Sequence, residues 1–355
     1  MDTATTELLD LDRIINLDDV EALALTRLDP VVAAYLLGGA GDEETLRDNR
    51  AAYSRYRLRP RIGEGGGVCM TTTLLGREVS MPVGIAPSAA HGYFCDDGEA
   101  ATATAAAAAG ALYCASSASS RPVEEIARAA DTWWYQCYPL SGAAGLGRAA
   151  ELGYHALVLT VDVPVAGHRD REFRSERAHP RHPMYDGAWG YARPGFDLSS
   201  HSHRTRVTWP DIRRLIAESD VPIVLKGVVT AEDAVMAGDA GAAAVWVSNH
   251  GGRQLDRAIA TLDALPEVVD AVGGDLEVYV DGGVRRGVDV AVALALGARA
   301  VFVGRAPVLG LAAGGVRGAT VVLEQLRKEL ENALSLLGVN DPAALDRSAV
   351  RAAGS

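Results

Sequence analysis

The stretch PIVLKGVVTAEDAVMAGDAGAAAVWVSN, residues 222–249, contains two short apolar runs separated by an alanine-rich segment. The runs at 222–228 and 243–249 are apolar almost throughout, which is typical of strands buried on both faces of a parallel sheet. The alanine-rich segment between them is typical of a helix. The stretch therefore predicts one strand–helix–strand unit.

Runs of this kind recur along the chain, each followed by an alanine-rich or amphipathic segment. They occupy residues 82–88, 112–117, 133–139, 156–162, 222–228, 243–249, 277–283 and 300–306. Eight buried strands that alternate with helices favour a closed parallel (β/α)8 barrel, the TIM barrel, over the competing doubly wound open sheet. We expect one α/β domain over residues 1–355, with the barrel itself at about 82–310.

The segments outside the barrel carry weaker patterns. Residues 1–66 are expected to form a helical extension, with a helix at 42–56, and residues 68–81 a hairpin that covers the barrel floor. Residues 315–338 predict a closing helix. The segment 163–208, after the fourth strand, is rich in Arg, His, Pro and Gly and predicts a long loop over the barrel mouth.

The amino-acid composition limits the classes of partner that the protein can bind. The chain has 34 Lys and Arg against 46 Asp and Glu, a net charge of −12, without a basic cluster, so we expect neither nucleic acid nor an anionic membrane as a partner. The four cysteines include no C-x-x-C pair, and no metal site is expected. The acidic N-terminus lacks a signal-peptide pattern, which predicts a cytoplasmic protein.

The seventh and eighth strand runs end in glycines and arginines, DGGVRRG at 281–287 and GRA at 304–306. Glycines let the backbone approach a phosphate, and an arginine adds a charged contact. In barrels these two strand ends are the usual phosphate site, whereas the alternative is tight turns with solvated arginines. The residues expected to hold a phosphate are Gly282, Gly283, Arg285, Gly304 and Arg305.

Other strand ends carry candidate catalytic groups. Lys226 suits either a Schiff base or a fixed positive charge beside a developing anion; a structural lysine is the alternative. His250 is a candidate general base, and Asp162 a candidate to orient its imidazole. Arg253 suits a substrate carboxylate. Further candidate donors are Arg169, Tyr35 and Tyr138.

The motif SNHGGRQLD at 248–256, together with LKGV, DGGVRRG, VGR, TVDVP, MTTTLLG and APSA, resembles the FMN-dependent 2-hydroxy acid oxidases and dehydrogenases. This family includes enzymes that oxidise glycolate, lactate and mandelate. The resemblance runs from about Tyr35 to Leu337. It implies FMN as the cofactor, a 2-hydroxy acid as the substrate and a homotetrameric assembly.

The resemblance also implies roles for individual residues. It makes His250, paired with Asp162, the base that removes a substrate proton, and Lys226 the charge near the pyrimidine edge of the flavin. The flavin ring would be lined by Pro87, Ser88, Ala89, Ser116, Gln136, Thr160, Lys226, Ser248 and Asp281, and its phosphate held by the five residues named above. The substrate would be bound by Tyr35, Arg169 and Arg253 at its carboxylate, by Tyr138 at its hydroxyl, and by Ala89 and Ala118 along the pocket wall.

Some positions depart from the common pattern of the family. The loop FCDDGE at 94–99 lacks a His-Pro pair, and Ala118 stands where glycolate oxidases carry a tryptophan. The smaller side chain favours an aromatic or otherwise bulky (S)-2-hydroxy acid, oxidised to the 2-keto acid with dioxygen as the acceptor. The open alternatives are another electron acceptor, oxidative decarboxylation, a Schiff-base aldolase or isomerase acting on a phosphorylated substrate, and a flavin-binding protein without turnover.

Overall fold

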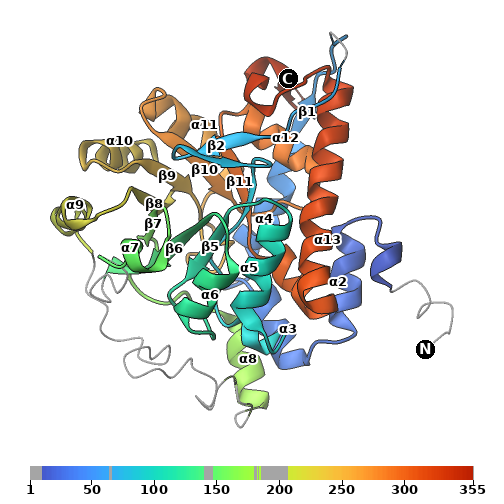
Figure 1. Ribbon diagram of the computed structural model, residues 1–355, viewed down its shortest axis with the longest axis vertical. Helices are drawn as coiled ribbons and strands as arrows, with labels where there is room; N and C mark the ends of the chain where they lie inside the picture. The colour runs from blue at the N-terminus through green and yellow to red at the C-terminus, as the bar shows by residue number, and fades with distance from the viewer. Residues whose placement is uncertain are drawn as a thin grey trace.

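Eight parallel strands close into a barrel in the order β4 to β11, with β11 paired back to β4. The structure is a computed structural model, and it describes residues 10–63, 66–139, 147–179, 182, 184 and 207–354. The strands are β4 (Val83–Ile85), β5 (Tyr113–Ser116), β6 (Trp133–Cys137), β7 (Leu157–Thr160), β8 (Ile223–Val228), β9 (Ala244–Val247), β10 (Glu277–Asp281) and β11 (Ala300–Val303). All eight predicted strands and the TIM barrel are confirmed (Figure 1).

The strands are apolar throughout because they are buried on both faces. One face packs into the barrel interior, where Trp134, Trp246, Tyr279 and Phe302 form a fully buried aromatic cluster. The ring centroids of Trp246 and Phe302 lie 4.0 Å apart. The other face packs against the surrounding helices in a second, larger core. This two-sided burial is the physical reason for the continuous apolar runs.

One or more helices follow each barrel strand and form the outer layer (Figure 1). They are α5 (Gly98–Ala108), α6 (Val123–Ala129), α7 (Ala149–Leu152), α8 (Asp170–Ala178), α9 (Trp209–Glu218), α10 (Ala231–Asp239), α11 (Thr261–Val272), α12 (Gly287–Ala295) and α13 (Arg305–Leu337). The alternation of strand and helix is what the sequence predicts for a (β/α)8 barrel.

Helix α13 is longer than the predicted closing helix. It begins at Arg305, directly after β11, and Gly314 and Gly315 interrupt it with non-helical backbone, so the predicted helix forms its second part. By length and composition α13 resembles a membrane span, but most of its most apolar window is buried in this structure. It packs against α2 (Leu17–Leu25), α5 and α12 and is a core helix of the barrel.

The hairpin β2 (Thr72–Leu74) and β3 (Arg77–Val79) covers the barrel floor, as predicted. Its Leu74 and Val79 side chains belong to the interior core. The backbone N–H of Leu75 donates to the Glu277 carboxylate at the start of β10, at 3.2 Å. The hairpin therefore closes the end of the barrel opposite the carboxyl ends of the strands.

The N-terminal extension is helical, as expected, and contains η1 (Leu11–Arg13), α2, α3 (Pro30–Leu37), α4 (Glu44–Ala51) and η2 (Ala52–Arg55). Helix α4 and η2 together occupy the predicted helix at 42–56. The sequence did not indicate β1 (Tyr56–Leu58), which pairs antiparallel with β12 (Val350–Ala352) near the C-terminus. Short 3₁₀ helices complete the structure: η3 (His91–Tyr93), η5 (Pro342–Ala344) and η6 (Arg347–Ala349).

The expected long loop at 163–208 is wrong for its first part, because residues 170–178 form helix α8. Arg169 is the N-cap residue of α8, and Asp170 pairs with Arg174 one turn later at 2.8 Å. Such pairs stabilise a short polar helix locally. Helix α8 packs against α3 beside the barrel (Figure 1). Residues 180, 181, 183 and 185–206 lie outside the described part of the chain.

Candidate active site

A cavity of about 670 Å³ lies at the carboxyl ends of the barrel strands. Most of the residues predicted for the site line it: Tyr35, Pro87, Ser88, Ala89, Ser116, Ala118, Tyr138, Arg169, Lys226, His250, Arg253, Asp281, Gly282, Gly283, Arg285, Gly304 and Arg305. Four predicted residues do not line the cavity: Gln136, Thr160, Asp162 and Ser248. Their side chains form hydrogen bonds with residues of the cavity wall or with one another. The topology thus brings the predicted residues together at one end of the barrel.

His250 follows β9 at a sharp turn. Its backbone φ is 59°, and Gly251 and Gly252 continue the left-handed conformation with φ of 63° and 74°. This turn places the His250 Nδ1 atom 3.2 Å from the Asp162 Oδ1 atom. With Nδ1 facing a carboxylate, the other ring nitrogen, Nε2, is left to accept a proton.

Asp162 lies next to His250, beyond the end of β7, and its side chain is 12% exposed. Burial by itself raises the pKa of Asp162, but the neighbouring His250 and Lys226 bring it below its usual value. The carboxylate is therefore ionised at neutral pH. A fixed negative charge at this distance stabilises the imidazolium that forms when His250 takes a proton.

Lys226, at the end of β8, is 4% exposed and belongs to a closed polar network. Its Nζ atom donates to the Ser248 hydroxyl at 2.8 Å, and that hydroxyl donates to Asp281 Oδ1 at 2.8 Å. Burial lowers the pKa of Lys226, but Asp281 and Asp162 outweigh it and raise the pKa above its usual value. Lys226 is thus a permanent positive charge, and the neutral amine that a Schiff base requires is disfavoured.

A row of polar side chains continues from Lys226 along the neighbouring strand ends. The Ser116 hydroxyl donates to Gln136 Oε1 at 3.1 Å, and Gln136 Nε2 donates to the Thr160 hydroxyl at 3.0 Å. Thr160 is in register with Lys226 on β8. This row presents fixed donors and acceptors, which suits the polar edge of a planar heterocycle such as the flavin ring.

The opposite side of the cavity carries the predicted phosphate residues. Gly304 is the N-cap residue of α13, and a Cβ atom there would meet only Ala86, at 3.9 Å, so its backbone is open. A helix N-terminus with exposed N–H groups is a ready anion site. Gly283 has a further reason to be glycine, because a Cβ atom there would lie 2.0 Å from the Asn49 carbonyl oxygen.

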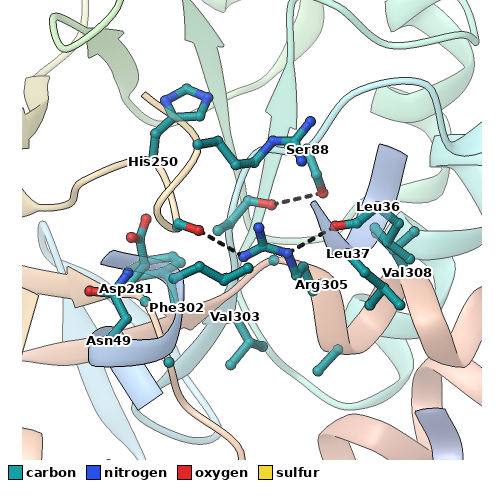
Figure 2. Close-up of a pocket in the computed structure, with 18 of the residues that line it drawn as sticks. Leu36, Leu37, Asn49, Ser88, His250, Asp281, Phe302, Val303, Arg305 and Val308 are labelled. Atoms are coloured by element: carbon teal, nitrogen blue, oxygen red, sulfur yellow. Dashed lines mark hydrogen bonds between the residues drawn. The ribbon is translucent and has the colours of Figure 1, made fainter. Parts of the chain in front are cut away.

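The Arg305 guanidinium donates hydrogen bonds to backbone carbonyls of neighbouring segments. It donates to Leu36 O at 2.9 Å and to Gly251 O at 2.9 Å (Figure 2). It also donates to Gly38 O at 3.0 Å. Burial lowers the pKa of Arg305 to about 9, and the nearby Arg253 lowers it as well. A partly buried guanidinium bonded to neutral carbonyls at the wall of a cavity suits a bound anion such as phosphate.

Arg285 points in part away from the predicted phosphate position. Its Nη2 atom contacts Glu21 at 2.5 Å and Asp18 at 3.1 Å on α2. Its Nε atom is buried and has no hydrogen-bond partner among the described residues. Arg285 thus ties α2 to the cavity wall and keeps one donor for a ligand.

Arg253 and Tyr35 lie together at the rim of the cavity. The Arg253 Nη1 atom donates to Tyr35 O at 2.7 Å and to Gly38 O at 2.8 Å, and the guanidinium lies 4.9 Å from the centroid of the Tyr35 ring. Arg169 reaches the same cavity from the N-cap of α8, and its buried Nε atom has no hydrogen-bond partner in the described part of the chain. These groups form a carboxylate clamp, defined here as Tyr35, Arg169 and Arg253.

Several structural residues of the site had no signal in the sequence. Asn49 on α4 and Asn249 after β9 exchange two amide hydrogen bonds of 2.8 Å and fix the loop that carries His250. Within the departing loop FCDDGE, the Glu99 carboxylate accepts hydrogen bonds from the backbone of His91 and from Ser120. Glu99 thereby joins the loops that carry Ser88 and Ala118. Only the spatial arrangement reveals these long-range contacts.

The residues present fit FMN at both ends of the cavity. The helix N-terminus at Gly304 and the partly buried Arg305 suit its phosphate, while the polar row and Lys226 suit its ring. Among the described residues, no cluster of His, Cys, Asp and Glu could hold a metal ion.

Comparisons with known proteins agree with this site. Residues 24–352 match the family described as FMN-dependent dehydrogenase. The L-lactate oxidase of Nostoc sp. is 41% identical, with 94% of this chain and 97% of that protein covered. The 2-hydroxyacid oxidase 2 of Homo sapiens is 40% identical, with 95% and 98% covered.

A solved structure of mandelate oxidase with benzoyl-formic acid is similar in fold. It has a TM-score of 0.84 and 38% sequence identity, with 94% of this chain and 97% of that chain covered. Because the family match spans the barrel and the predicted site lies within it, the chain belongs to the FMN-dependent dehydrogenase family and is an FMN enzyme that oxidises 2-hydroxy acids.

Proposed function

We propose that this enzyme oxidises an (S)-2-hydroxy acid with an aromatic or otherwise bulky side chain, such as mandelate, and passes the electrons to dioxygen. The observation that carries the proposal is Ala118 at the cavity wall, where the resemblance places a tryptophan in glycolate oxidases. Ala89 is a second small residue of the same wall, and Tyr93, a neighbour large enough to refill the space, does not line the cavity. The space suits a phenyl group.

The chain's own residues divide the work of the reaction. Arg169 and Arg253 hold the substrate carboxylate, and Tyr138 meets its hydroxyl group. His250 takes the substrate proton at Nε2, and Asp162 stabilises the resulting imidazolium. FMN, when bound, accepts the two electrons, and the Lys226 ammonium supplies a positive charge that favours its reduced form.

Dioxygen as the acceptor is supported by the names of the relatives, lactate oxidase and 2-hydroxyacid oxidase. Two variants of the same chemistry differ in the acceptor or in the product. A decarboxylating enzyme releases benzoate from mandelate, whereas an oxidase releases benzoylformate. The aldolase alternative is disfavoured because Lys226 is held as an ammonium by Asp281.

The experiment is anaerobic bleaching of the flavin with a panel of 2-hydroxy acids, followed by air and product analysis. We expect (S)-mandelate to bleach the flavin faster than lactate or glycolate, air to restore the colour at once, and benzoylformate to accumulate. Faster bleaching by glycolate would refute the aromatic preference. Recovery that requires an added quinone would refute dioxygen as the acceptor.

We also propose that the enzyme is a cytoplasmic homotetramer, in line with the family resemblance. Light scattering coupled to gel filtration tests the assembly: a mass near four chains supports it, and a monomer mass refutes it.

A further inference from the structure

Glu172 stands directly behind the carboxylate clamp. Its Oε2 atom lies 2.9 Å from Arg169 Nη1 and 3.8 Å from Arg253 Nη2, so one oxygen faces both guanidinium groups. Both arginines line the cavity, whereas Glu172 does not. A substrate carboxylate in the cavity would therefore meet the arginines from one side while Glu172 holds them from the other.

The contact of Glu172 with the two arginines is partly buried, and helix α8 holds it in place. The side chains of Arg169, Arg253 and Glu172 are 13%, 16% and 15% exposed, so solvent screens their charges far less than at an open surface. Helix α8 begins immediately after Arg169 and places Glu172 in its first turn, close to the clamp. The preceding residue of the helix, Arg171, pairs with Glu43 at 2.5 Å and anchors α8 to the N-terminal extension.

The net charge of Arg169, Arg253 and Glu172 determines how many negative charges a ligand of the clamp can carry. Two guanidinium groups carry +2, and the Glu172 carboxylate reduces the sum to +1. A single carboxylate from a ligand then neutralises the clamp, whereas a second negative charge on the ligand would find no uncompensated cation within the clamp and would be repelled by Glu172.

We propose that Glu172 is a specificity-determining residue that sets the charge of the clamp, so that the enzyme favours 2-hydroxy monocarboxylates over dicarboxylates. The inference rests on the proposed function, because it takes Arg169 and Arg253 as the groups that bind the substrate carboxylate. Glu172 acts through these arginines and does not touch the substrate.

The clamp keeps its shape without Glu172. Arg253 remains fixed by the carbonyls of Tyr35 and Gly38 and by the Tyr35 ring. Arg169 keeps its backbone position at the N-cap of α8 and is drawn to a bound carboxylate. Removing the charge of Glu172 therefore changes mainly the potential in the cavity, and it strengthens the binding of anions.

The test is calorimetric titration of the FMN-loaded wild type and the Glu172→Gln variant with benzoylformate, a monoanion, and oxalate, a dianion. Coulomb's law for unit charges within about 12 Å of each other at an effective dielectric of about 20 predicts at least roughly tenfold tighter binding of benzoylformate and at least roughly a hundredfold tighter binding of oxalate. The gain should shrink as salt is added. Asp170→Asn is the matched control, because it removes one charge from the same turn of α8, where Asp170 pairs with Arg174 and His168.

The outcomes separate the two proposals. A larger gain for oxalate than for benzoylformate in Glu172→Gln, with Asp170→Asn within about twofold of the wild type, supports the inference. Equal gains, no gain or weaker binding of both ligands overturns it and leaves Glu172 a structural residue. A wild type that binds neither carboxylate refutes the proposed function itself, and the inference falls with it. The Glu172→Asp variant, which keeps the charge, should behave as the wild type.

Discussion

The pair formed by His250 and Asp162 gives the most quantitative prediction. The Asp162→Asn substitution keeps the shape of the side chain and removes its charge 3.2 Å from His250 Nδ1. Coulomb's law at this distance and an effective dielectric of about 20 gives roughly 5 kcal/mol for the imidazolium–carboxylate attraction. The His250 side chain is 27% exposed, and solvent screening reduces this value to about 3 kcal/mol. The rate of flavin reduction should therefore fall by roughly a hundredfold.

The assay is anaerobic stopped-flow reduction of the bound flavin by saturating (S)-mandelate, which isolates the chemical step from the reaction with dioxygen. FMN content should stay close to that of the wild type, because Asp162 does not line the cavity. A variant that reduces its flavin within about threefold of the wild-type rate would refute the role of Asp162. Loss of FMN would instead indicate that the fold of the site depends on this carboxylate.

Three further predictions concern the pocket, the cofactor and the fold. Ala118→Trp should slow flavin reduction by mandelate at least about tenfold more than reduction by lactate, because an indole fills the cavity wall; equal losses would contradict the pocket argument. Arg305→Ala should weaken FMN binding at least about tenfold by fluorescence titration, since it removes a partly buried cation from the cavity wall, and an unchanged affinity would exclude a phosphate contact. Burial alone raises the pKa of Glu99, but His91 and Ser120 bring it below its usual value, so the ionised carboxylate stabilises the fold above about pH 4.3 and this stability is lost as the pH falls. Urea unfolding should thus show Glu99→Gln about 2 kcal/mol less stable at pH 7 and a smaller difference near pH 4; a difference independent of pH would count against this account.

The barrel could be predicted from the sequence because a strand that is buried on both faces has a recognisable local sequence pattern. Each strand is a continuous apolar run, and its carboxyl end is where the polar residues begin. Lys226 and His250 were therefore recognisable as site residues, Lys226 from its position near the end of β8 and His250 from its position after β9. Their chemistry follows from the fold: parallel strand ends meet at one mouth, so residues far apart in the chain share one cavity.

The remaining features depend on long-range contacts that a local sequence pattern does not indicate. Asn49 and Asn249 are 200 residues apart, and no sequence pattern indicates that their side chains bind each other. The contact of Arg285 with Glu21 depends on how α2 packs against the barrel. Helix α8 was missed because the segment 163–208 as a whole is rich in Arg, His, Pro and Gly, which is typical of a loop. Short-range pairs such as Asp170 with Arg174 stabilise this one helical part.

A crystal structure of the enzyme with FMN and benzoylformate would test the central claim most directly, because it measures where both molecules lie. The account predicts the FMN phosphate at the N-terminus of α13, beside Gly304 and Arg305, and the benzoylformate carboxylate on Arg169 and Arg253 within reach of His250. A phosphate bound elsewhere, or a carboxylate remote from the two arginines, would contradict it.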